Sequence, residues 1–181
     1  MHNKNYINNL KSDKKITKLY YIKTLTNKSE QQKSIEKLLN LQRINPHRIA
    51  DIACGGGGAS LHLSKVYTKS IYYLLDINPL ALSLAKKKLI GANFIITKGS
   101  IYKIPFPKNY FDLVICCQTL SWISNPLKAL NELVRICRPK GTVIATSLFN
   151  TDHDVDIYAK LKDNTRNTGK LNQWYSYNTI S

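Results

Sequence analysis

The sequence predicts an α/β fold, a doubly wound and mostly parallel sheet of about five strands. Short apolar segments alternate with helical patterns, and small or polar residues follow where the apolar segments end. Such alternation predicts right-handed βαβ units and a parallel sheet. Ligands bind these sheets outside the carboxyl ends of the strands, so the residues that follow each strand are the candidate site. The predicted strands cover residues 48–53, 71–75, 93–97, 111–117 and 142–148, and the helices between them cover residues 59–66, 79–89 and 127–137.

The rest of the chain divides into an arm, a leading helix and a tail. The parts are a Lys- and Asn-rich N-terminal arm (1–28), the ligand-binding domain (29–150) and a C-terminal tail (151–181). One short helix is predicted in the arm over about 16–25. Ser29 and Gln32 have the spacing of a capping box, which predicts a helix over about 30–43. A further helix is predicted in the tail over 152–161.

The composition suits one domain. A length of 181 residues with 43% hydrophobic residues is enough for one substantial core. No run of 18 apolar residues occurs and the first residues have no apolar secretory core, so we expect a cytoplasmic protein without a membrane span. The four cysteines form no Cys-x-x-Cys pair, which predicts neither a metal site nor disulfides. The net charge of +16 is spread along the chain without a recognisable nucleic-acid module, so nucleic acid stays a less favoured partner.

A glycine run follows the first predicted strand. Asp51 ends that strand, and the four glycines 55–58 lead into a helix whose N-terminus exposes free N–H groups. A dinucleotide site needs a third glycine where Ser60 stands, and the carboxylate of Asp51 would repel a pyrophosphate. S-adenosylmethionine instead carries an ammonium and a sulfonium, which a carboxylate attracts. The acid before the glycines therefore favours S-adenosylmethionine as the cofactor.

These residues resemble motif I of class I S-adenosylmethionine-dependent methyltransferases. Asp51, Ala53, Gly55 and Gly57 stand at the four defined places of D-x-G-x-G-x-G, with Ala53 in place of the first glycine. The resemblance covers about residues 48–149. It implies methyl transfer to a small-molecule acceptor. Within the family, the sequence most resembles the small-molecule group that includes ubiquinone/menaquinone and carboxyl-methylating enzymes.

Further cofactor contacts follow from the later strand ends. Asp76 ends the second strand, where a carboxylate can accept both ribose hydroxyls; the alternative is that Asp76 or Asn78 caps the next helix. The resemblance implies that Ile77 packs on the adenine. It also implies that Ser100 accepts a hydrogen bond from the adenine amino group, where many members carry Asp. The remaining implied cofactor-binding residues are Cys54, Ile101, Cys117 and Gln118.

The catalytic residues stay unassigned, because the sequence offers no convincing general base. His62 lies in the helix after the glycine run and is expected to serve packing or the surface. Asp112 precedes the buried fourth strand and is expected to be structural. The family continues after the fifth strand with a helix and an antiparallel strand pair, whereas about 30 residues remain here. We therefore expect a C-terminally incomplete sheet whose exposed fifth strand favours self-association.

Two alternative functions stay open. The serine at position 100 and the short carboxyl end favour a non-catalytic methyltransferase fold that acts as a binding or partner subunit. An NAD-dependent oxidoreductase is the second alternative, and both Asp51 and Ser60 count against it.

Overall fold

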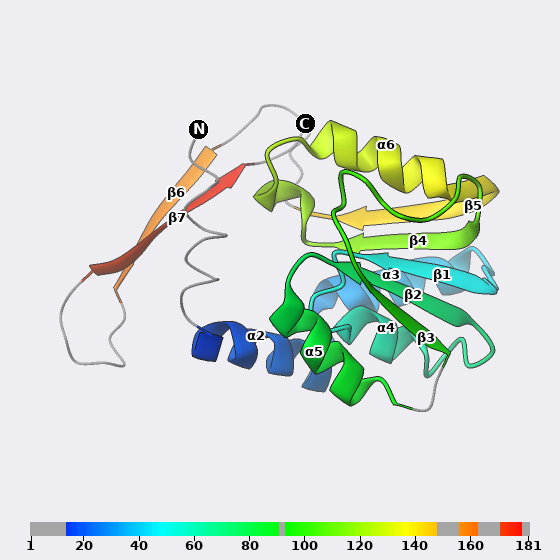
Figure 1. The fold of residues 1–181 in the computed structure, drawn as a ribbon, viewed down its shortest axis with the longest axis horizontal. Helices are drawn as coiled ribbons and strands as arrows, with labels where there is room; N and C mark the ends of the chain where they lie inside the picture. The colour runs from blue at the N-terminus through cyan, green and yellow to red at the C-terminus, as the bar shows by residue number, and fades with distance from the viewer. Residues whose placement is uncertain (1–13, 91–92, 148–155, 163–170, 179–181) are drawn as a thin grey trace.

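The computed structural model describes residues 14–90, 93–147, 156–162 and 171–178, with side chains for 18–90 and 93–147. Helices and strands alternate through the central part of the chain, as predicted (Figure 1). The helices are α2 (Lys14–Thr26), α3 (Glu30–Leu41), α4 (Gly58–Leu63), α5 (Pro79–Lys88), η1 (Leu120–Trp122) and α6 (Pro126–Ile136). The strands are β1 (Arg48–Ile52), β2 (Ile71–Asp76), β3 (Phe94–Lys98), β4 (Phe111–Cys117), β5 (Cys137–Thr146), β6 (Asp156–Lys162) and β7 (Leu171–Asn178).

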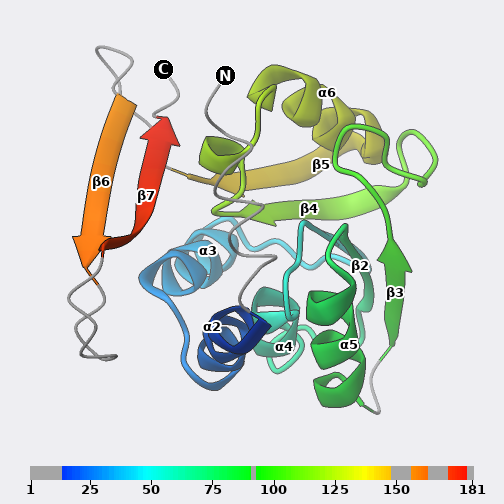
Figure 2. The same ribbon diagram turned by 60° about the vertical axis from the view of Figure 1, so that its left-hand side comes forward.

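The first five strands form one parallel sheet in the order β3-β2-β1-β4-β5. The chain builds outward from β1 to β3 and then crosses back to place β4 on the other side of β1. The strand order therefore reverses between β1 and β4, which is where such sheets bind ligands. Figure 2 shows α6 on one face of the sheet and α3, α4 and α5 on the other. The predicted doubly wound α/β fold is confirmed.

Each face of the sheet has its own apolar cluster. Ile52 and Val114 pack with Leu133 and Ile136 of α6 on one face. On the other face, strand residues such as Ile115 pack with side chains from the three helices α3, α4 and α5. Strand β4 contributes fully buried residues to both clusters, so its continuous apolar sequence reflects burial on two sides.

Polar caps set the starts of the helices. The side chain of Ser29 accepts from the Gln32 N–H, and the Gln32 side chain accepts from the Ser29 N–H, which confirms the capping box. Asn78 caps α5 through its side-chain oxygen, which accepts from the backbone of Leu80 and Ala81. The capping role therefore belongs to Asn78, and the Asp76 carboxylate is used elsewhere.

An ion pair on α6 holds the segment after β3. The guanidinium of Arg135 lies 2.6 Å from the Glu132 carboxylate and also donates to the carbonyls of Ile104 and Phe106. Glu132 in turn accepts from the Ile104 N–H. Glu132 and Arg135 are three positions apart on the helix, and the larger effect of the pair is to fix a loop of the chain against α6.

Helix α6 ends one residue from its predicted end and three residues before Pro139, whereas β5 begins earlier than predicted. Its last residue is Ile136, and β5 begins at Cys137 instead of residue 142. The carbonyls of Arg135 and Ile136 accept from the N–H groups of Asn109 and Tyr110. Pairing with the loop before β4 therefore ends the helix, three residues before the proline.

The helix predicted over 152–161 is wrong where the structure describes it. Residues 156–162 form β6, which pairs antiparallel with β7 in a two-stranded sheet of its own. Ile157, Ala159 and Leu161 alternate with more polar residues, a period of two that suits a strand better than a helix. An antiparallel pair is thus present, contrary to our expectation, although it does not extend the five-stranded sheet. Among the described strands β5 pairs with β4 alone and is the expected edge, while residues 152–155 lie outside the described part.

Candidate cofactor site

The glycine loop between β1 and α4 lies at the carboxyl ends of the central strands. Ala53, Gly55 and Gly57 have φ values of 58°, 55° and 81°, so alternate residues of the loop adopt the left-handed conformation. Glycine adopts it at no steric cost, whereas an alanine there is strained by roughly 1 kcal/mol. Ala53 in place of the motif's first glycine therefore carries local strain, of the kind that collects at binding sites.

Asp76 joins the glycine loop to the end of β2. Its Oδ2 accepts from the Gly55 N–H at 2.8 Å, and its Oδ1 accepts from the Asn78 N–H at 2.8 Å. The structure thus brings together two predicted site residues that are 21 positions apart. Burial raises the pKa of Asp76, and its three backbone hydrogen bonds only partly offset this.

Asp51 lies beneath the glycine loop. Its side chain is only 1% exposed, and its Oδ2 accepts from the Ser60 hydroxyl at 2.7 Å. Burial raises the pKa of Asp51 to about 6, although the hydroxyl and backbone of Ser60 oppose this rise. In this arrangement a cation above the loop would feel the field of the carboxylate without touching it.

Among the residues whose side chains the structure describes, the two carboxylates at this edge of the sheet have no basic partner. Six acidic side chains are described in the structure, and four of them pair with a lysine or arginine: Glu30, Glu36, Asp112 and Glu132. Asp51 and Asp76 are the other two, in a protein of net charge +16. Burial raises the pKa of the Cys54 thiol, and the charges of Asp51 and Asp76 raise it further. The strand ends therefore form a locally negative region that suits a cation.

Residues after β2 and β4 complete the predicted site. Ile77 is 63% exposed directly beside Asp76, so its apolar side chain is available to a flat ring. Cys117 is the partly buried last residue of β4, and burial, followed by the charge of Asp51, raises the pKa of its thiol. Gln118 has a φ of 53°, and its N–H donates to the Thr146 carbonyl in β5, which leaves its exposed side chain for a ligand.

The segment after β3 is held beside Asp76 by its backbone. The Gly99 N–H donates to the Asp76 carbonyl, which brings Ser100 to the same edge. The Ser100 hydroxyl accepts from the Tyr102 N–H at 3.2 Å and remains partly exposed. Ile101, in contrast, is 9% exposed and belongs to the apolar cluster that faces α6. It supports the loop from below.

Tyr21 of α2 is a site residue that the sequence analysis missed. A Cβ on Gly55 would lie 2.8 Å from Cε1 of the Tyr21 ring, so the ring packs directly on the glycine loop. Its hydroxyl lies 3.5 Å from Nδ2 of Asn78. Nothing in the sequence of residues 14–26 indicates this contact, because it depends on how the arm folds back onto the loop.

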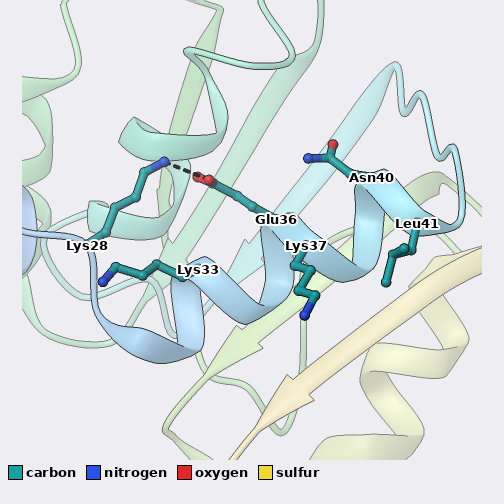
Figure 3. Close-up of a pocket in the computed structure, with 6 residues that line it drawn as sticks. All are labelled: Lys28, Lys33, Glu36, Lys37, Asn40 and Leu41. Atoms are coloured by element: carbon teal, nitrogen blue, oxygen red, sulfur yellow. Dashed lines mark hydrogen bonds and ion pairs between the residues drawn. The ribbon is translucent and has the colours of Figure 1, made fainter.

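Two other features lie away from this edge. His62 is buried beside Gln32 and Ile35 of α3, so it serves packing and does not face the strand ends. An open hollow of about 630 Å³ lies along α3, and Figure 3 shows the side chains around it. It is lined by Lys28, Lys33, Glu36, Lys37, Asn40 and Leu41, and no predicted site residue contributes to it.

A family described as the methyltransferase domain matches residues 50–145, which run from β1 into β5. The chain belongs to this methyltransferase family. The matched residues include the carboxyl ends of β1, β2, β3 and β4, which carry the predicted cofactor contacts. The family and the geometry therefore point to the same edge of the sheet.

Similar proteins and structures agree with the family. The ubiquinone/menaquinone biosynthesis C-methyltransferase of Nitrosospira multiformis is 35% identical over 54% of this chain and 41% of that protein. An uncharacterized protein of Methanocaldococcus jannaschii is 35% identical over 68% of this chain and 52% of its own length. A SAM-dependent methyltransferase structure from Aquifex aeolicus is 27% identical, with a TM-score of 0.59 over 73% of this chain and 74% of that one. The chain spans about two fifths of the length of the first curated relatives that it matches.

Proposed function

We propose that this domain binds S-adenosylmethionine at the carboxyl ends of β1, β2 and β4 and transfers its methyl group to a small-molecule acceptor. One observation carries the proposal: Asp51 and Asp76 flank the left-handed glycine loop, and neither has a basic partner among the side chains that the structure describes. A donor with an ammonium and a sulfonium is attracted to this negative region of a strongly basic protein, whereas a pyrophosphate is repelled.

The residues present fit the parts of this cofactor. Both oxygens of the Asp76 carboxylate accept backbone N–H groups, and of their four lone pairs one remains that can accept a ribose hydroxyl. The exposed side chain of Ile77 offers an apolar surface to the adenine. The Ser100 hydroxyl can accept from the adenine amino group. Asp51 acts through its field from beneath the loop.

The chemistry requires alignment more than proton transfer. The bound sulfonium supplies an activated methyl group, and the protein holds donor and acceptor in line, which alone contributes several kcal/mol. The catalytic residues stay unassigned, because none of the predicted site residues is placed as a general base. Relatives named as ubiquinone/menaquinone C-methyltransferase and malonyl-[acyl-carrier protein] O-methyltransferase support an organic, non-nucleic-acid acceptor.

Calorimetric titration with S-adenosylmethionine, S-adenosylhomocysteine and NAD tests the proposal. We expect the first two to bind and NAD to leave the heat signal unchanged. If a well-folded sample binds neither of the first two, the proposal is wrong. Binding without methyl transfer to any of a panel of quinol, phenol and carboxylate acceptors would instead favour a non-catalytic partner subunit.

Ser100→Asp is expected to tighten S-adenosylmethionine binding by about 1 kcal/mol, because a carboxylate accepts the adenine amino hydrogen more strongly than a hydroxyl does. An aspartate can also keep the bond from the Tyr102 N–H. Titration of both proteins under the same conditions measures the change. Unchanged or weaker binding by the variant would show that position 100 does not contact the adenine.

A further inference from the structure

One face of α2 packs on the glycine loop. Tyr21, Thr24 and Leu25 are spaced i, i+3 and i+4, so they share a face of the helix. A Cβ added at Gly56 would lie 3.1 Å from Cβ of Tyr21, and one added at Gly58 would lie 2.5 Å from the Thr24 carbonyl oxygen. In this arrangement the missing side chains of the loop make room for α2, and no layer of ligand atoms fits between the Tyr21 ring and the loop.

The Tyr21 side chain also reaches the place proposed for the ribose. The Tyr21 ring packs against Gly55, and the Gly55 N–H donates to the Asp76 carboxylate. The hydroxyl end of the ring lies 3.5 Å from the side chain of Asn78, two residues beyond Asp76. Tyr21 thus extends from the glycine loop to the end of β2, along the path that connects the two halves of the proposed site.

The helix that presents Tyr21 is weakly anchored. Leu25 is the one buried side chain among residues 18–26, at 7% exposure, whereas Leu19 and Tyr20 are 58% and 51% exposed. Figures 1 and 2 both show α2 lying against α4 and α5 at the rim of the domain. A helix with so little buried apolar surface can leave its position at low energetic cost.

We propose that α2 is a displaceable cover of the cofactor site, and that the Tyr21 ring must leave the glycine loop before S-adenosylmethionine can bind. This inference rests on the proposed function. Cofactor and ring then compete for one surface, so the measured affinity is the intrinsic affinity multiplied by the fraction of molecules with the ring displaced. Removing the ring should raise the measured affinity.

Tyr21→Ala tests the cover directly, with Tyr20→Ala as the matched control on the same helix. Both changes lower the side-chain volume equally, and it is Tyr21 that supplies the atoms nearest to a Cβ added at Gly55 or Gly56. We expect Tyr21→Ala to bind S-adenosylmethionine roughly tenfold more tightly than the wild type, which corresponds to a cover closed in about nine molecules of ten. Tyr20→Ala should stay within about twofold, and Tyr21→Phe, which keeps the ring, should resemble the wild type.

Hydrogen exchange of the wild-type protein gives a second readout that needs no variant. Amides of residues 14–26 should exchange faster with saturating S-adenosylmethionine than without it, while those of α3 serve as the reference and stay unchanged. Slower exchange in α2, or equal or weaker binding by Tyr21→Ala, would overturn the cover and leave the proposed function standing. Absence of binding by the wild type and by Tyr21→Ala alike would overturn the proposed function itself.

Discussion

Asp76→Asn is expected to weaken S-adenosylmethionine binding by about 10- to 100-fold, because hydrogen bonds to a charged group contribute about 1.5–3 kcal/mol. The amide keeps one acceptor oxygen and presents N–H donors to either Gly55 or Asn78, each of which already donates a backbone N–H at this point. The variant therefore loses acceptor capacity for the ribose and loosens the glycine loop. Calorimetric titration at neutral pH measures the loss.

Asp112→Asn is the matched control for that change. Asp112 also accepts two backbone N–H bonds, from His47 and Arg48, but it lies at the amino ends of the strands. Both variants should lower the free energy of unfolding, and only Asp76→Asn should lower cofactor affinity when both proteins are folded. An equal loss of affinity in the two variants would mean that Asp76 acts through general stability and not through contact with the ribose.

Asp51→Asn is expected to stabilise the protein at pH 8, and to stabilise it about half as much at pH 5. Burial raises the folded-state pKa of Asp51 from 3.8 to about 6. Folding therefore favours the protonated carboxyl. The contribution of this proton to the free energy of unfolding is complete below pH 3.8 and is lost as the pH rises through 6. Above that range the buried charge lowers the free energy of unfolding by about 3 kcal/mol, which an uncharged asparagine avoids.

Thermal unfolding of the two proteins at pH 5 and pH 8 measures this difference. Ser60→Ala is the control of opposite sign, since it removes the hydroxyl that donates to Asp51 and should destabilise the protein more at pH 8 than at pH 5. If Asp51→Asn lowers the melting temperature equally at both pH values, the carboxylate is a hydrogen-bond acceptor only. The destabilising charge of the Asp51 carboxylate would then have no role in binding a cation.

The five-stranded sheet could be predicted because its signals are local. Each strand is a short apolar run, and Asp51, Asp76 and the glycines mark where the strands end. Helix starts were predictable for the same reason, since Ser29 with Gln32 and Asn78 before Pro79 act within one turn of the chain. The family resemblance rests on these same strand-end residues.

The parts that failed depend on contacts between distant segments. The early start of β5 at Cys137 accompanies hydrogen bonds from Asn109 and Tyr110 to the end of α6, and the local sequence does not indicate these bonds. The period of two at Ile157, Ala159 and Leu161 becomes decisive only with β7 as its partner. The packing of Tyr21 on Gly55 joins an arm with a weak apolar pattern to a loop that lies 34 positions further along the chain.

The central claim is that two carboxylates at the strand ends, which have no basic partner among the described side chains, hold a cationic cofactor. The most direct test is the number of protons released when S-adenosylmethionine binds at pH 6. Calorimetry in two buffers of different ionisation enthalpy gives this number. The ammonium of the ligand is already protonated at this pH. Because a bound cation lowers the pKa of Asp51 from about 6, we predict release of up to about half a proton per site, and none in Asp51→Asn. Binding with no proton release, or with proton uptake, would contradict the account.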